Sequence, residues 1–228
     1  MSKKTLKKEV LTIDKLIETA ERFCILESKN ENSFLYGITD GKAVGTYIEH
    51  KFKAFLEMSF VVERGNPARG IDLPSPGINT DIKVTSIKQP QSSSPFKDAK
   101  QKIFGLGYNL LVFVYDKTDN SENETAILNF ISCSFINKER TADYTTTKRL
   151  IEMVKDGANE EDISAYLSDR NIPADEITLG KIARQILDSP PVLGYLTISN
   201  ALQWRLQYGR IVSLKEKVSG ITKIVDNI

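Results

Sequence analysis

Two aspartates and a lysine stand close together in the stretch GIDLPSPGINTDIKVTSIKQPQSSSPF, residues 70–96. Asp72 and Asp81 are separated by eight residues that include a turn rich in Gly and Pro, and Lys83 follows two places after Asp81. Two converging carboxylates repel each other unless a cation lies between them, and oxygen ligands suit Mg²⁺. Such a cation polarises a phosphate oxygen and activates water, while a lysine stabilises developing negative charge. These residue types therefore favour phosphodiester hydrolysis.

The composition disfavours other catalytic classes. His50 is the only histidine among 228 residues, so a zinc site built on two or three imidazoles is not expected, nor is a nuclease that needs several histidines. The net charge of +1 gives no overall attraction to nucleic acid. The charge is unevenly spread, however: residues 81–105 and 201–228 each carry a balance of +3, and residues 151–179 carry −6.

The pattern Asp/Glu-x-Lys is weak evidence by itself, because it occurs five times, starting at Glu27, Asp40, Glu49, Asp81 and Asp98. Only Asp81–Lys83 lies in a segment, residues 78–87, whose apolar and polar residues alternate with period two, as in a strand. Residues i and i+2 of a strand share one face, about 6–7 Å apart. The alternative is structural: Asp81 and Lys83 form a solvent-facing pair, and Asp72 stabilises the turn before Pro74.

The elements around these residues predict an α/β core. Helical periodicity indicates helices at 5–27 and 44–58, before the Gly/Pro turn and the strand. The polar loop QPQSSSP leads to an amphipathic segment of helical length, FKDAKQKIFGL. Two nearly continuous apolar segments, NLLVFVYD and AILNFISCSFI, then predict strands buried on both faces. We therefore expect a mixed central β-sheet flanked by helices.

The pattern becomes mostly helical from about residue 144. We expect an N-terminal helix plus the α/β core at residues 1–143 and a mainly helical region at residues 144–228, which provides scaffold, dimer or DNA contacts. One compact domain overall is the alternative. No apolar run is long enough to cross a membrane. Cys24 and Cys133 both lie in apolar patterns, which favours a cytoplasmic protein with reduced core thiols.

The arrangement Asp72…Asp81-Ile82-Lys83, with a helix before it and a helix and strand after it, resembles the PD-(D/E)XK nuclease superfamily. The run DIKVTS followed by a polar loop is most similar to the type II restriction endonucleases of that group. The resemblance covers roughly residues 44–136 and implies a restriction-endonuclease-like core.

The resemblance also implies roles for individual residues. Asp72 and Asp81 would bind Mg²⁺, with Ile82 included in the metal site, and Lys83 would be the motif lysine. Many members carry a glutamate on the preceding helix, for which Glu49 is the match. Glu63 is a rival for that position. Two features depart from the family pattern: Ile71 replaces the proline before the first acid, and the eight-residue gap is short for two strands of a hairpin.

Candidate DNA contacts follow the motif strand and recur near the C-terminus. Gln pairs with adenine, Ser contacts bases or phosphates, and Arg contacts guanine or phosphates. An ordinary polar loop is the alternative for the first group, and Trp204 is expected to be a core residue. The candidates are Gln89, Gln91, Ser92, Ser93, Ser94, Lys97, Asn200, Gln203, Arg205 and Arg210.

The sequence thus predicts a type II restriction endonuclease that hydrolyses double-stranded DNA at specific sequences with Mg²⁺. A homodimer is expected by analogy with the family, because a two-fold symmetric site calls for a two-fold symmetric protein. One alternative is a repair or structure-specific nuclease of the same fold. The other is a non-catalytic DNA-binding regulator that uses the C-terminal helices.

Overall fold

The computed structural model of the chain describes residues 8–63, 70–199 and 203–227. The chain forms two compact units, one drawn from Met1–Gln89, Leu110–Phe135 and Lys223–Ile228 and the other from Pro90–Asn109 and Ile136–Thr222. This division differs from the predicted boundary between residues 143 and 144. Its physical reason is that strands from distant parts of the chain pair within each unit.

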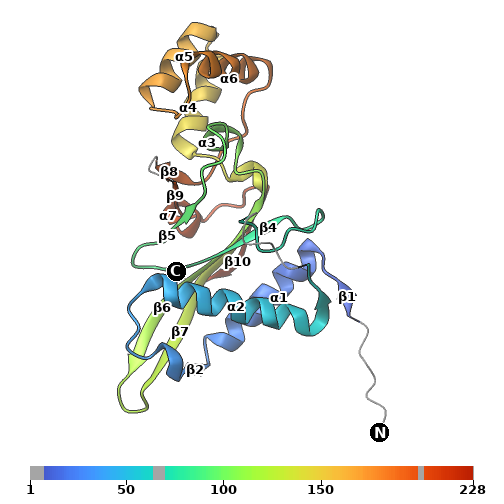
Figure 1. Cartoon of the computed structure of the whole chain (residues 1–228), viewed down its shortest axis with the longest axis vertical. Helices are drawn as coiled ribbons and strands as arrows, with labels where there is room; N and C mark the ends of the chain where they lie inside the picture. The colour runs from blue at the N-terminus through green and yellow to red at the C-terminus, as the bar shows by residue number, and fades with distance from the viewer. Residues whose placement is uncertain (1–7, 64–69, 200–202, 228) are drawn as a thin grey trace. The chain divides into compact units, whose positions relative to one another are not determined.

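The first unit is built on a five-stranded sheet (Figure 1). Its strands run in the order β10 (Ile221–Asp226), β7 (Thr125–Ile136), β6 (Asn109–Asn120) and β4 (Thr80–Ser86), and β2 (Glu31–Asn32) pairs antiparallel with β7. The consecutive strands β6 and β7 form a long hairpin, visible in Figure 1. The predicted apolar strands are confirmed, since both are buried along most of their length.

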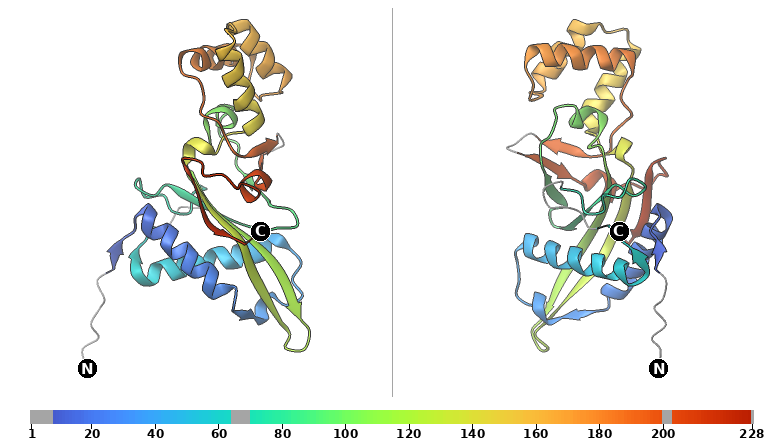
Figure 2. Two further views of the ribbon diagram at one scale, coloured as in Figure 1. Left: turned by 180° about the vertical axis from the view of Figure 1, so that it is seen from behind. Right: turned by 45° about the vertical axis from the view of Figure 1, so that its right-hand side comes forward.

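Two helices, α1 (Ile13–Glu27) and α2 (Gly41–Ser59), cover this sheet (Figures 1 and 2). Their buried residues recur every three or four positions, which is the spacing of one helix face. The core they form with the sheet contains a group of aromatic rings whose centroids lie 5.0–6.0 Å apart, made by Phe23, Phe52, Phe113 and Phe130.

The N-terminal helix begins later than predicted. Thr12 caps α1 by accepting a hydrogen bond from the backbone N–H of Lys15. Before it, β1 (Glu9–Val10) pairs parallel with β3 (Phe60–Val61), so these residues are extended rather than helical. The first residues of the predicted helix, 5–7, lie outside the described residues.

The second unit contains three helices within the region predicted to be mainly helical: α4 (Tyr144–Lys155), α5 (Glu160–Asp169) and α6 (Glu176–Asp188). Their apolar faces share one core with the short helix α3 (Gln101–Phe104). The amphipathic segment around α3 was expected to form a longer helix. It ends at Gly105 because this residue has a φ of +89°, and a Cβ there would meet the carbonyl oxygen of Lys138 at 2.3 Å.

The same unit holds a three-stranded antiparallel sheet in the order β5 (Gln91–Ser94), β9 (Trp204–Gln207) and β8 (Thr197–Ser199). One expectation is wrong here: the polar loop at residues 91–94 is a strand. The region after α6, within the mainly helical region predicted at residues 144–228, contains the short strands β8, β9 and β10 and the short helix α7 (Gly209–Val212), joined by irregular segments. The pairing of β5 with β9, which are far apart in sequence, explains both strands, because each strand supplies the other with backbone partners.

Cys24 and Cys133 are free thiols buried in the core of the first unit, as predicted. Burial raises the pKa of the Cys133 thiol. Among the described residues, no helix combines the length and hydropathy that a membrane span requires.

Candidate active site

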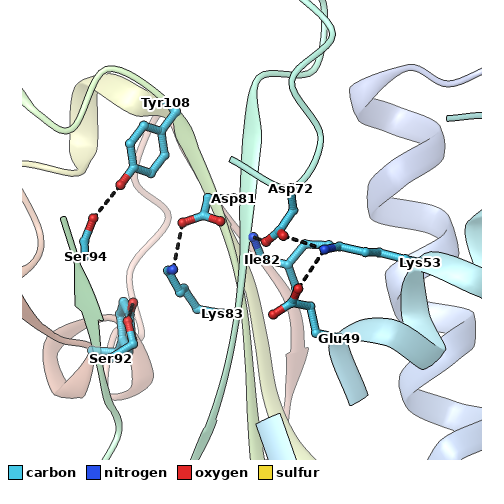
Figure 3. Close-up of polar contacts among 10 residues, drawn as sticks. Glu49, Lys53, Asp72, Asp81, Ile82, Lys83, Ser92, Ser94 and Tyr108 are labelled. Atoms are coloured by element: carbon cyan, nitrogen blue, oxygen red, sulfur yellow. Dashed lines mark hydrogen bonds and ion pairs between the residues drawn. The ribbon is translucent and has the colours of Figure 1, made fainter. Parts of the chain in front are cut away.

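Asp81 and Lys83 project from the same face of β4 (Figure 3). Nζ of Lys83 lies 2.8 Å from Oδ2 of Asp81, an ion pair in which Oδ2 has no hydrogen bond of good geometry. Asp81 is only 3% exposed. The alternative of a solvent-facing surface pair is therefore wrong, because this acid is withdrawn from water.

The turn before β4 brings Asp72 to the same place. Leu73 and Thr80 form an antiparallel bridge with two backbone hydrogen bonds of 3.0 Å, so the chain folds back along the start of β4. Oδ2 of Asp72 then accepts the backbone N–H of Ile82 at 2.8 Å. The eight-residue gap is long enough because a single bridge, rather than a long hairpin, positions Asp72.

The carboxyl groups of Asp72 and Asp81 lie close enough to influence each other's protonation. Burial raises the pKa of Asp81 to about 7; Lys83 opposes this rise and Asp72 adds to it. Burial also acts to raise the pKa of Asp72, but its interaction with Asp81 and its hydrogen bonds with Lys53 and the N–H of Ile82 outweigh burial and lower that pKa. Of the two carboxyls, Asp81 is therefore the one whose charged form burial disfavours.

Lys53 joins this pair to Glu49 on α2. Its Nζ lies 2.5 Å from Oδ1 of Asp72 and 2.7 Å from Oε1 of Glu49 (Figure 3). Burial raises the pKa of Glu49, partly offset by Lys53. Burial acts to lower the pKa of Lys53, but its two carboxylate partners outweigh this and raise it. Sequence reasoning missed Lys53, although its position four residues after Glu49 on a helix was the available signal.

Glu63, the rival of Glu49, accepts a hydrogen bond from the hydroxyl of Ser75 at 3.2 Å. Glu49 is the glutamate that the structure links to Asp72. Other Asp/Glu-x-Lys acids have structural roles: Glu27 pairs with Lys51 at 2.7 Å, Asp40 caps α2, and Asp98 accepts the N–H of Lys100 at 2.8 Å.

The cluster therefore contains three carboxyl groups, from Glu49, Asp72 and Asp81, and two ammonium groups. In the described parts of the chain, no three His, Cys, Asp or Glu side chains converge as a ready-made metal site. A reason is that the Nζ of Lys53 lies between Glu49 and Asp72. A cavity of about 370 Å³ adjoins the cluster and is lined in part by His50, Lys53 and Asp72.

The candidate DNA contacts are distributed over both units. Gln89 is exposed in the turn after β4, and Lys97, Gln203, Arg205 and Arg210 are exposed in the second unit. The guanidinium group of Arg210 lies 3.6 Å from the ring centroid of Tyr144. Asn200 lies outside the described residues.

The side chains of β5 divide into two sets. The hydroxyl of Ser94 hydrogen-bonds with that of Tyr108 at 2.6 Å (Figure 3). The hydroxyl of Ser92 hydrogen-bonds with that of Tyr208 at 2.5 Å, and Ser94 is fully buried. The hydroxyl of Ser94 is therefore not accessible to DNA, contrary to the prediction for this residue. Gln91 and Ser93 alternate with these serines and are partly exposed. Trp204 is a core residue, as predicted.

The α/β fold and the acid–lysine cluster on β4 define a nuclease of the PD-(D/E)XK type. The family model described as "Type II restriction enzyme NspV" matches residues 10–223. A protein named Type II restriction enzyme NspV, from Nostoc sp. (strain ATCC 29411 / PCC 7524), is 52% identical over 218 residues, which cover 96% of this chain and 98% of that relative. The chain belongs to the NspV family of type II restriction enzymes. No solved structure matches it at a significant level.

Proposed function

We propose that this protein is a Mg²⁺-dependent endonuclease that cuts both strands of duplex DNA at a specific sequence. The observation that carries the proposal is the convergence of the buried Asp81 and the partly buried Asp72, with the ammonium group of Lys83 at 2.8 Å from Asp81 and the carboxylate of Asp72 fixed by the N–H of Ile82. Family membership supports a DNA substrate, and the three side chains supply the chemistry that hydrolysis of a phosphodiester needs.

The donor set fits Mg²⁺. Oδ2 of Asp81 is buried and lies in an ion pair with Lys83, and burial, with a further contribution from the nearby Asp72, raises the pKa of Asp81. Both features favour a hard divalent cation with oxygen ligands. Asp72 and Asp81 would hold it, with Glu49 and the region of Ile82 as the remaining protein contribution. Bound Mg²⁺ would polarise the phosphate and lower the pKa of a water molecule.

The chain's own groups then have separate tasks. Lys83, anchored at 2.8 Å from Asp81, stabilises the negative charge that builds on the phosphate and orients the attacking water. The N–H of Ile82 fixes Oδ2 of Asp72, so this carboxylate is oriented before substrate arrives. In the reaction, the water oxygen bonds to phosphorus, one P–O ester bond breaks, and the leaving oxygen takes up a proton.

The first test is digestion of a long duplex DNA of known sequence, with Mg²⁺ and separately with EDTA. Discrete DNA fragments that form with Mg²⁺ but not with EDTA support the proposal. Nicks that depend on DNA structure would indicate a repair nuclease, and binding without cleavage would indicate a regulator.

The second test replaces the motif residues. Asp81→Ala should abolish cleavage, and Lys83→Ala should lower its rate by about 10²–10⁴-fold, while both variants still bind the duplex. Asp98→Ala is the matched control, since Asp98 starts another Asp-x-Lys match and is exposed. Full cleavage by Asp81→Ala would contradict the active-site assignment.

A further inference from the structure

We propose that the outward face of the β5–β9–β8 sheet recognises base edges of duplex DNA and so determines which sequence is cut. The inference rests on the proposed function and names the recognition surface for it. The surface is defined by one side of three strands that come from two separate parts of the chain. Its members are Gln91, Ser93, Thr197, Ser199, Arg205 and Gln207.

Strand register places these six side chains in two rows. Gln207 is paired with Gln91 on one side and with Thr197 on the other. Arg205 is paired in the same way with Ser93 and Ser199. Directly opposite residues of antiparallel strands carry side chains on the same face, about 5 Å apart at Cβ. One row therefore presents two amides and a hydroxyl, and the other presents a guanidinium group between two hydroxyls.

The opposite face of the sheet is committed to the core. Trp204, Leu206 and Ile198 are buried, and the hydroxyls of Ser92 and Ser94 bond to tyrosines. This fixes the orientation of all three strands, because a shift by one residue would place Trp204 and Leu206 in water. Both rows of outward side chains are thus held on a rigid support, as a sequence-recognition surface requires.

The chemistry of the outward face is that of major-groove recognition. Gln pairs bidentately with adenine, Arg pairs bidentately with guanine, and hydroxyls contact either base. The six residues include one positive charge and no carboxylate, which suits a polyanion. Short antiparallel strands are a known element for reaching base edges in the groove.

The test measures sequence preference by binding alone, so it does not depend on cleavage. Duplexes are selected from a randomised pool by the wild-type protein with Ca²⁺ in place of Mg²⁺, and a selected duplex is compared with its scrambled version by fluorescence anisotropy. Arg205→Ala and Gln207→Leu should each lower the affinity ratio of selected to scrambled duplex by about 5- to 150-fold. Arg205→Lys should bind the scrambled duplex as the wild type does, but its preference for the selected duplex should fall, because the Lys ammonium group cannot form the two parallel hydrogen bonds of a guanidinium group.

Arg184→Ala is the matched control: its guanidinium group is also exposed in the second unit but pairs with Glu160 at 2.8 Å. It should leave the ratio unchanged, and circular dichroism verifies folding of every variant. The inference is overturned if the wild type selects no sequence. It is also overturned if the sheet variants keep the affinity ratio within about twofold of the wild type, or if they weaken binding to both duplexes equally. If the wild type selects a sequence but does not cleave the selected duplex with Mg²⁺, the proposed function is contradicted and the recognition surface is not.

Discussion

The ammonium group of Lys53 lies between Glu49 and Asp72, at hydrogen-bonding distance from both. All three side chains are partly withdrawn from water, so each carboxylate depends on this cation more than a surface acid would. Lys53 therefore neutralises the acids in the protein without metal. Since a divalent cation would be attracted to the same two carboxylates, Lys53 and the cation compete for them.

Replacing Lys53 by Met should separate the neutralisation of the acids by Lys53 from its competition with a divalent cation. We expect Lys53→Met to lose about 1–3 kcal/mol of stability in EDTA, because the partly buried carboxylates of Glu49 and Asp72 lose the ammonium group that they share. Added Mg²⁺ or Mn²⁺ should raise the melting temperature of the variant more than that of the wild type. Calorimetric unfolding with and without the cation measures both. An equal cation response in the two proteins would contradict the competition.

At the scale of elements, the site depends on how closely α2 approaches β4. Glu49 and Lys53 lie on α2, whereas Asp81 and Lys83 lie on β4. Gly45 makes the approach possible, since a Cβ at this position would meet the carbonyl oxygen of Val84 at 3.3 Å. A larger side chain there must move the helix away from the strand.

We expect Gly45→Leu to lower stability by about 1–3 kcal/mol and to lower the cleavage rate by moving Glu49 and Lys53. Gly41→Leu is the matched control on the same helix, because a Cβ at Gly41 meets no atom within 4 Å. Urea unfolding and the rate of DNA cleavage should both distinguish the variants. Equal behaviour of the two would show that the close approach at Gly45 has no role.

At the scale of the whole molecule, the chain divides into two units with separate cores, and the family match spans parts of both. The acid–lysine cluster belongs to the first unit and the proposed recognition sheet to the second. One chain supplies one cluster of this kind among its described residues, whereas a double-strand cut needs chemistry on both strands. A symmetric pair of chains meets that need.

We therefore expect a homodimer of twice the 25.6 kDa chain mass by light scattering. When wild type is mixed and re-equilibrated with an excess of Asp81→Ala protein, mixed dimers should nick plasmid DNA on one strand. A monomer that cuts both strands at full rate, with no nicked product in the mixture, would contradict the dimer.

Features that depend on local periodicity could be predicted from the sequence. Asp81 and Lys83 share a face because their spacing is that of a strand. Helical periodicity placed Glu49 on a helix, whereas its role came from the family resemblance and stays a prediction. The two long apolar strands and the helical region of α4, α5 and α6 were also predicted from local patterns. Such patterns involve neighbours in the chain, whose relative positions the backbone geometry already restricts.

Features that depend on contacts between distant segments needed the tertiary structure. Residues 91–94 look like a polar loop, and only pairing with residues 204–207 makes them a strand that buries Ser94 and leaves Ser93 partly exposed. Likewise, nothing local places Lys53 against Asp72, nineteen residues later. The sequence by itself determines the types and spacing of the chemical groups. Which of them become buried, paired or exposed is set by long-range packing, because burial and its electrostatic consequences arise only when distant segments meet.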